Sequence, residues 1–340
     1  MDIQQALAQV IEQQNLSYDE MRTVMHQIMT GEATPSQISG FLVALRMKGE
    51  SVDEVAGAAS VMRELASSVT LASDNSVDIV GTGGDGHKTF NISTASAIVT
   101  AAAGATVAKH GNRSVSSSSG SADLLEAVGV NLDLNAEQVA TCVNQIGLGF
   151  MFAVKHHAAM KHAIGPRKEM GVRTIFNVLG PLTNPAGAQN QLLGVYAESW
   201  LEPLAQVLQQ LGSRHVMVVH SQDGLDEISI SAKTDCVELK NGQINRRVID
   251  PLDYGFRVAE MNEIVVADIA GSKKMVLEVL DNNPGPALDI VLLNSGAAIY
   301  VAGLVTSLEK GIEKAKQVIA DGDARVKLEQ LVNLSNNVNA

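Results

Sequence analysis

The stretch VDIVGTGGDGHKTFNISTASAIVTAAA, residues 77–103, decides how this chain should fold. It begins with the short β-branched run of residues 77–80, which is typical of a strand. A glycine-rich turn follows, and the alanine-rich residues 91–103 then favour a helix. Strand, turn and helix in this order form the repeating unit of α/β proteins.

The same alternation continues after this stretch. We expect strands near residues 106–109, 192–196 and 215–220, a helix over residues 122–128, and further helices between the later strands. This alternation predicts a mostly parallel central sheet that is covered by helices. From residue 287 onward the chain should be mainly helical and should close on the polar tail NLSNNVNA.

The first seventy residues carry helical signals and no strand signal. Apolar residues keep helical spacing from Ile3 to Ile11, and capping-box spacing begins at Ser17 and again at Ser51. Between these two, Thr34-Pro35 is a typical helix start. The chain therefore begins with several short helices before the α/β region.

The composition favours a globular protein and disfavours nucleic-acid or membrane partners. The chain has 340 residues, of which 46% are hydrophobic, so it can bury a large core. Its formal net charge of -12 and its aromatic content of 3% leave few cations and stacking rings for a nucleic acid. No apolar run approaches the roughly 18 residues of a membrane span.

The N-terminus and the cysteines indicate the compartment. Residues 1–15 contain an acid at Asp2 and lack the basic patch and apolar run of a signal peptide, so we expect a cytoplasmic protein. Cys142 and Cys236 are too few and too far apart for a disulfide framework or a zinc site.

The glycine-rich turn, residues 81–86, is a candidate phosphate-binding loop. Glycines let the backbone approach a phosphate closely, and the amides of the loop and of the following helix start would point at the anion. The hydroxyl-rich start of that helix, residues 91–94, favours this function. The pattern matches neither of the common nucleotide-binding glycine motifs, so a plain structural turn is the alternative.

A second candidate segment, KHGNRSVSSSSGS at residues 109–121, follows the next predicted strand. Lys109 and Arg113 could neutralise phosphate charge, and the serines and loop amides could bind its oxygens. The alternative is a flexible serine-rich loop. Two such loops after successive strands favour one shared anion site.

The third candidate is the acidic segment DGLDE at residues 223–227, which follows the strand that should end near His220. Ligands of open α/β sheets bind at the carboxyl ends of strands. Asp226 and Glu227 there would repel a diphosphate unless Mg²⁺ stood between, although solvated surface charge is the alternative. His156 and His157 precede a helical stretch and are better explained as structural than as metal ligands.

Four segments together resemble the anthranilate phosphoribosyltransferase family, in this order and at fitting separations. They are GTGGDGHKTFNIST, KHGNRSVSSSSGSAD, HHAAMKHAIGPRKEMGVRTIFNVLGPLTNPAG and HSQDGLDEIS. The resemblance implies a nucleoside-phosphorylase-like α/β fold, with a small all-helical domain joined to a larger α/β domain that has a mostly parallel central sheet. It implies a helical domain of residues 1–72 with 166–185 contributing, and an α/β domain that binds 5-phosphoribosyl 1-diphosphate (PRPP) from residues 73–165 and 186–340.

The resemblance also implies the site residues. Those for PRPP would be Gly81, Gly84, Asp85, Thr89, Asn91, Ile92, Ser93, Thr94, Lys109, His110, Gly111, Asn112, Arg113, Ser114, Val115, Ser116, Ser117 and Ser121. Those for anthranilate would be Gly81, Asn112 and Arg167, with His110 and Pro181 lining its approach. Mg²⁺, two ions per subunit, would bind to Ser93, Asp226 and Glu227. No residue is assigned as a general acid or base.

The implied reaction transfers the phosphoribosyl group of PRPP to anthranilate, giving N-(5-phosphoribosyl)anthranilate and diphosphate in tryptophan biosynthesis. The implied assembly is a homodimer through the helical domain. One position departs from the family pattern, because Ser118 stands where many relatives would carry Lys or Arg. The serine-rich loop would then hold diphosphate with one positive charge fewer.

Two other functions have to be weighed against this one. A pyrimidine nucleoside phosphorylase of the same fold shares a lysine-containing glycine and serine loop, but the NIST segment, the Asp226-Glu227 pair and the region around Arg167 favour the transferase. A non-enzymatic nucleic-acid-binding relative would keep the scaffold and develop a basic groove. The complete motifs and the net charge of -12 argue against it.

Overall fold

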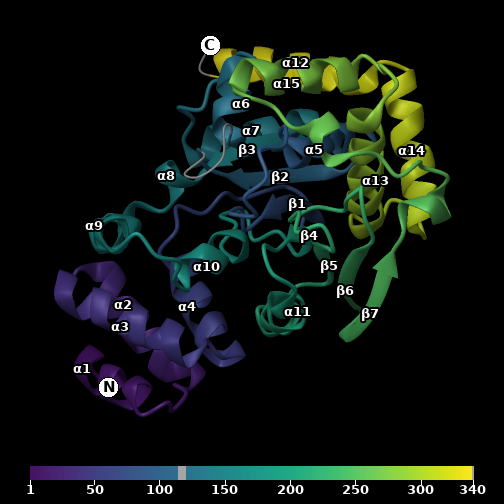
Figure 1. The fold of residues 1–340 in the computed structure, drawn as a ribbon. Helices are drawn as coiled ribbons and strands as arrows, with labels where there is room; N and C mark the ends of the chain where they lie inside the picture. Colours follow the sequence, from purple (N-terminus) through teal and green to yellow (C-terminus); the bar gives the residue numbers. More distant parts are fainter. Residues whose placement is uncertain (114–119, 339–340) are drawn as a thin grey trace.

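The computed structural model describes residues 1–113 and 120–338 of the chain. Four helices come first, and in Figure 1 they form the purple group at one end of the molecule. Each begins at a capping box, at Asp2, Ser17, Thr34 and Ser51, which confirms the helix starts predicted from the sequence. The four helices are α1 (Ile3–Ile11), α2 (Tyr18–Thr30), α3 (Pro35–Lys48) and α4 (Val52–Glu64).

A seven-stranded sheet follows, in the order β3-β2-β1-β4-β5-β6-β7. The first five strands in this order are parallel, and β6 and β7 add antiparallel to the edge at β5. The predicted mostly parallel sheet is confirmed, while β3, β6 and β7 were not foreseen. The strands are β1 (Ser76–Gly81), β2 (Thr106–Gly111), β3 (Leu148–Phe152), β4 (Asn190–Gly194), β5 (His215–Ser221), β6 (Thr234–Lys240) and β7 (Gln243–Ile249).

Helices cover both faces of this sheet (Figure 1). The long apolar helix α13 is buried along most of its length and packs against α5 and α14. The last helix, α15, continues to Asn337, so most of the expected polar tail is helical. The helices after the N-terminal four are α5 (Ile92–Ala102), α6 (Ser121–Ala127), α7 (Ala136–Ile146), α8 (Ala153–His156), α9 (Lys161–Met170), α10 (Phe176–Leu182), α11 (Leu201–Gln210), α12 (Ile269–Leu280), α13 (Pro286–Val301), α14 (Leu308–Ala320) and α15 (Asp323–Asn337).

The alternation of side chains along the strands divides the core in two. Leu192 on β4 and Met217 on β5 face a cluster built with α5 and α12 to α15. Their neighbours Leu193 and Val216 face a second cluster, which includes α11, α10 and the helices α1 to α4. The N-terminal helices thus share an apolar core with the face of the sheet that carries Leu193 and Val216. The division at residue 72 stays a prediction.

The strand order also determines where a ligand can bind. The chain builds β1, β2 and β3 outward in one direction, then crosses to β4 and β5 on the other side of β1. The connections after β1 and after β4 therefore diverge, and open α/β sheets bind their ligands at such a point, in the crevice outside the carboxyl ends of the strands. The predicted phosphate loop, residues 81–86, leaves β1 at this point.

Candidate functional site

The acidic segment lies directly on the carboxyl ends of β1 and β4. Gly81 and Gly194 are paired across these strands. A Cβ atom on Gly194 would lie 1.5 Å from the Asp226 carbonyl oxygen, and one on Gly81 would lie 2.6 Å from Asp226 Oδ2. Because a Cβ cannot come so close, both strand ends need glycine for residues 222–227 to reach them.

The three predicted metal ligands meet at this point, together with Asp85. The Gly83 amide donates to Asp226 Oδ2 at 2.8 Å. Burial first, and the nearby Asp85 carboxylate second, raise the pKa of Asp226 to about 7. Burial and the Asp226 charge hold the pKa of Glu227 well above its usual value, while the Lys109 charge and a hydrogen bond from the Ser93 backbone oppose this.

These residues fit a hard divalent cation. Burial, together with neighbouring carboxylates, raises the pKa values of Asp226 and Glu227, and a cation bound between these acids and Asp85 would relieve the excess of negative charge. Mg²⁺ in proteins is commonly bound by one or two carboxylates together with substrate phosphates and water. Within residues 1–113 and 120–338, no group of three or more His, Cys, Asp or Glu side chains is arranged to hold a metal ion unaided.

Lys109 lies buried beneath the start of α5. Its Nζ donates to the Ile79 carbonyl at 2.5 Å and to Ser93 Oγ at 3.4 Å. Burial lowers the pKa of Lys109, and the charges of Asp78 and Glu227 oppose that shift. The structure therefore joins the second predicted segment to the first through one cation.

A buried carboxylate supports this arrangement from below. Asp78 on β1 accepts from the His110 amide at 3.1 Å and from Asn184 Nδ2 at 2.7 Å. Burial raises the pKa of Asp78 to about 6, although Lys109 and these hydrogen bonds act against the rise. Sequence reasoning passed over Asp78 and Asn184, because neither stands out until the strands are paired.

The start of α5 lies against the acidic segment, where the Ser93 backbone forms a hydrogen bond with Glu227. Asn91 precedes the helix, but its side chain does not cap it; instead Asn91 Oδ1 accepts from Ser272 Oγ at 2.7 Å. The first amides of a helix need external partners, and anions are favourable ones. Ser93 and Thr94 lie in this first turn, and the hydroxyl of Thr94 is buried without a hydrogen-bond partner in the structure. Thr89 pairs with Val265 in an isolated bridge.

Ser272 on α12 holds the Asn91 backbone and side chain through two hydrogen bonds. We predict that Ser272→Ala lowers the free energy of unfolding by about 1–2 kcal/mol, because buried polar groups lose their partner. Urea denaturation measures this change. Ser295→Ala is the matched control, since the buried Ser295 hydroxyl has no partner in the structure. Equal losses for both variants would contradict the role of Ser272.

Arg113 points away from this cluster. Its guanidinium forms ion pairs with Asp123 at 2.9 Å and Glu126 at 2.8 Å, and lies over the Phe152 ring. That Arg113 binds PRPP stays a prediction. Such binding requires the ion pairs with Asp123 and Glu126 to break. Gly111 ends β2, Asn112 follows it exposed, and Ser121 begins α6. The predicted residues Ser114, Val115, Ser116 and Ser117, and the departure at Ser118, lie outside the described residues.

Of the predicted acceptor residues, Gly81 lies at the predicted metal ligands, whereas Arg167 and Pro181 lie on α9 and α10. Arg167 on α9 is half-buried, with its guanidinium carbon 5.0 Å from the centre of the Phe176 ring. Among the described residues it forms no ion pair, neither with Glu169 two positions further along α9 nor with any other carboxylate. Burial lowers the pKa of Arg167. Pro181 is buried in α10.

A pair of buried histidine rings accompanies these residues. His110 and His157 lie with their ring centres 5.1 Å apart, and the Nε2 atom of each is buried without a hydrogen-bond partner among the described residues. Burial lowers the pKa of His110 to about 3 and that of His157 to about 4, so both rings are neutral at pH 7. The sequence predicts a structural role for His157, and its contact with His110 becomes visible only in the folded chain.

Comparison with known proteins agrees with this geometry. Residues 73–325 match the model of the glycosyl transferase family α/β domain, and residues 4–66 match that of its helical bundle domain. The chain is 62% identical, over 98% of its length and 99% of the relative's, to anthranilate phosphoribosyltransferase of Thioalkalivibrio sulfidiphilus. The chain belongs to the anthranilate phosphoribosyltransferase family.

Solved structures of anthranilate phosphoribosyltransferases share the whole fold. The Thermus thermophilus enzyme matches with a TM-score of 0.93 and 40% identity, covering 97% of this chain and 99% of that one. The Saccharomyces cerevisiae enzyme in complex with PRPP and Mg matches with a TM-score of 0.90 and 26% identity, covering 98% of both chains. Membership of this family replaces the phosphorylase and nucleic-acid-binding alternatives.

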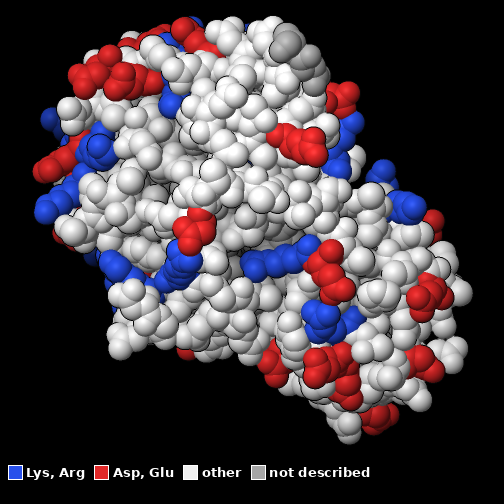
Figure 2. All heavy atoms as spheres, turned by 180° about the vertical axis from the view of Figure 1, so that it is seen from behind, with Lys and Arg blue, Asp and Glu red and all other residues white. Residues whose placement is uncertain are grey.

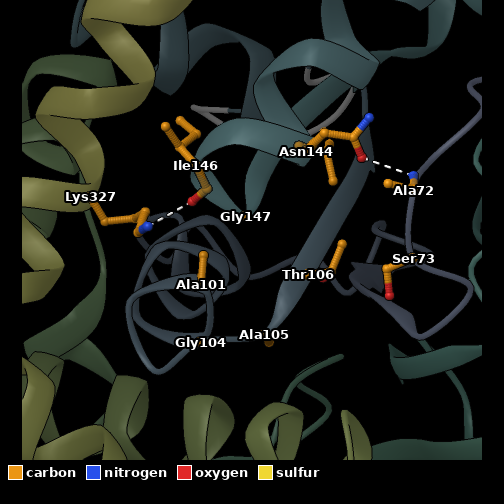
Figure 3. A pocket seen from close by; sticks show the side chains of 11 residues that line it. Ala72, Ser73, Ala101, Gly104, Ala105, Thr106, Asn144, Ile146, Gly147 and Lys327 are labelled. Carbon is orange, nitrogen blue, oxygen red and sulfur yellow. Dashed lines mark hydrogen bonds between the residues drawn. The ribbon is translucent and has the colours of Figure 1, made fainter.

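A cavity of about 220 Å³ lies away from this site. It is found at the amino ends of β1 to β3, the opposite edge of the sheet (Figure 3). Two of its polar side chains are hydrogen-bonded to the surrounding backbone: Lys327 donates to the Ile146 carbonyl, and Asn144 accepts from the Ala72 amide (Figure 3).

On the face shown in Figure 2, basic and acidic side chains are interspersed. No helix among the described residues is long and apolar enough to cross a membrane.

Proposed function

We propose that this protein transfers the phosphoribosyl group of PRPP to the amino group of anthranilate, releasing diphosphate, as a step of tryptophan biosynthesis. The observation that carries the proposal is the full-length identity of 62% to an anthranilate phosphoribosyltransferase. The meeting of the glycine loop, Lys109 and the acidic segment at the β1 and β4 ends supports it.

The donor site extends along the carboxyl ends of β1 and β2. Backbone amides of residues 81–86 and of the first turn of α5 would bind the phosphate oxygens. The Gly83 amide, which donates to Asp226, and the Ser93 backbone, which bonds to Glu227, would exchange these partners for the phosphate. Lys109 would supply a positive charge next to Ser93, where its Nζ already lies 3.4 Å from the hydroxyl. The remaining predicted PRPP contacts are proposed on the motif match.

Ser93, Asp226 and Glu227 would hold Mg²⁺, two ions per subunit, with Asp85 close by. Bound there, Mg²⁺ would neutralise the negative charge that develops on the diphosphate leaving group. The solved yeast relative bound to PRPP and Mg supports the use of this metal. The oxygen donors and the mutual repulsion of the carboxylates in this chain support the same sites.

The acceptor would lie between Arg167 and the neutral rings of His110 and His157. Its aromatic amine is uncharged at pH 7 and already nucleophilic, so no strong base is needed and the main task of the protein is to position it. We propose attack at C1 of the ribosyl group from the face opposite the diphosphate, through an oxocarbenium-like state with inversion. Closure of the helical part over the sheet would exclude water, which would otherwise hydrolyse PRPP.

Fluorescence of anthranilate tests this function directly. With PRPP and Mg²⁺ present, the fluorescence of the substrate should change with time as product forms, and diphosphate should be released in equal amount. Omission of PRPP is the control for photobleaching. A chain that releases diphosphate without consuming anthranilate would refute the acceptor assignment.

We further propose that the protein acts in the cytoplasm as a homodimer that associates through α1 and α3. These helices pack on each other and expose Ile11, Val43 and Met47, which are 59%, 38% and 78% accessible. Apolar side chains gathered on one surface are typical of protein interfaces.

For this interface we predict that Val43→Asp with Met47→Glu shifts the protein from dimer to monomer in sedimentation experiments, weakening association about tenfold or more. Val326→Glu on α15 is the control, because Val326 is 48% accessible and lies on a different helix. Loss of the dimer in the control, or its persistence in the double variant, would count against this surface.

A further inference from the structure

Arg173 contacts three segments that are far apart in the sequence. It lies in the turn between α9 and α10, six residues after Arg167, and its side chain is exposed. Its guanidinium donates to the Gly84 carbonyl and lies 4.3 Å from the centre of the Tyr196 ring, just after β4. Its own carbonyl accepts a hydrogen bond from Arg46 on α3.

The charge of Arg173 is not neutralised by a partner. Among the described residues it forms no ion pair, whereas Arg113, at the neighbouring loop, is paired with two carboxylates. A carbonyl oxygen and an aromatic face hold a guanidinium in place by hydrogen bonding and cation–π attraction. Arg173 is therefore a fixed positive charge at the glycine loop.

The glycine loop is tied to β4 through Thr82, whose amide donates to the Gly194 carbonyl and whose hydroxyl accepts from the Tyr196 amide, so its glycine turn depends on contacts further along. Gly83, Gly84 and Gly86 all have positive φ angles, of 64°, 78° and 83°, which residues other than glycine rarely adopt. Two contacts fix adjacent residues of the loop: Asp226 accepts from the Gly83 amide, and Arg173 donates to the Gly84 carbonyl. A Cβ on Gly84 would lie 3.4 Å from Arg173 Nη2, so the guanidinium packs closely against this turn.

We infer that Arg173 is a positioning residue that couples the donor loop to the acceptor side of the site. The turn that carries it belongs to the same segment as Arg167, and Arg46 ties that turn to the N-terminal helices. A movement of this segment is thus transmitted to the Gly84 backbone, which has to be in place to bind diphosphate. This inference rests on the proposed function only for the identity of the two ligands.

Arg46 acts through Arg173 in this arrangement, which a double-mutant cycle can detect. Arg173→Ala should raise the KM for PRPP about tenfold, and Arg46→Ala should raise it less, on the order of threefold. The double variant should match Arg173→Ala alone, because the contact of Arg46 has no further effect once the guanidinium is gone. Lys161→Ala, an exposed cation on α9, removes the same charge and should leave the KM unchanged.

A second measurement separates this inference from the proposed function. Calorimetric titration with inorganic diphosphate and Mg²⁺ requires no acceptor, and Arg173→Ala should weaken diphosphate binding about tenfold. Arg173→Lys should recover little of it, since Lys keeps the charge but lacks the planar group that stacks on Tyr196. Wild-type protein that binds diphosphate but does not consume anthranilate would refute the proposed acceptor and leave the effect of Arg173 measurable.

Three results would overturn the inference. The first is unchanged diphosphate binding in a folded Arg173→Ala protein, with folding checked by thermal unfolding. The second is full recovery by Arg173→Lys, since charge alone would then suffice. The third is independent, additive effects of Arg46→Ala and Arg173→Ala, since Arg46 would then not act through this residue.

Discussion

Removing Mg²⁺ with EDTA should abolish turnover, and Asp226→Asn or Glu227→Gln should each raise the Mg²⁺ concentration for half-maximal activity about tenfold or more. Each substitution keeps the shape of the side chain and removes one charged oxygen ligand from a hard cation. Both residues lie at the crevice, Asp226 over the ends of β1 and β4 and Glu227 beside Ser93 and Lys109. Initial rates across a Mg²⁺ titration measure the effect.

Two controls make this result specific. Glu202→Gln, on the exposed first turn of α11, also removes one negative charge and should leave the titration unchanged. Excess Mg²⁺ should restore activity to EDTA-treated wild-type protein, which distinguishes loss of metal from loss of structure. Titration curves for Asp226→Asn and Glu227→Gln that both overlay the wild-type curve would refute these residues as metal ligands.

Arg167→Ala should raise the KM for anthranilate far more than the KM for PRPP. The loss in kcat/KM should be about 2–3 kcal/mol, the scale of a buried charged hydrogen bond. The guanidinium is half-buried over Phe176, is free of any ion pair among the described residues, and can hold a carboxylate by two parallel hydrogen bonds. The helix should still form, because alanine is a good helix former.

Aniline provides the chemical control for Arg167, because it has the amine of anthranilate and lacks the carboxylate. It should react poorly with the wild type, and Arg167→Ala should change its rate little. Lys168→Ala, the exposed neighbour on α9, controls for net charge. Equal slowing of aniline and anthranilate by Arg167→Ala, or a change in the PRPP KM alone, would show that Arg167 does not recognise the acceptor.

Much of the donor side could be predicted because its signals are local. β1, the glycine turn and α5 follow one another in the sequence, and the acidic segment follows β5, so the strand pattern alone places both at the same sheet edge. The unforeseen strands had weaker local signals. β3 is a short apolar run, and β7 has mostly exposed side chains, because it pairs at the edge of the sheet.

The chain's own residue pattern determined the α/β class, the order of the loops and the types of group available to bind phosphate and Mg²⁺, since periodicity and motif spacing depend on near neighbours. The tertiary structure alone decided which groups meet. It placed Asp226 on Gly81 and Gly194, paired Arg113 with Asp123 and Glu126, and brought Arg173 to the glycine loop. These contacts join residues from about 10 to more than 140 positions apart, so they depend on how strands pair and helices pack.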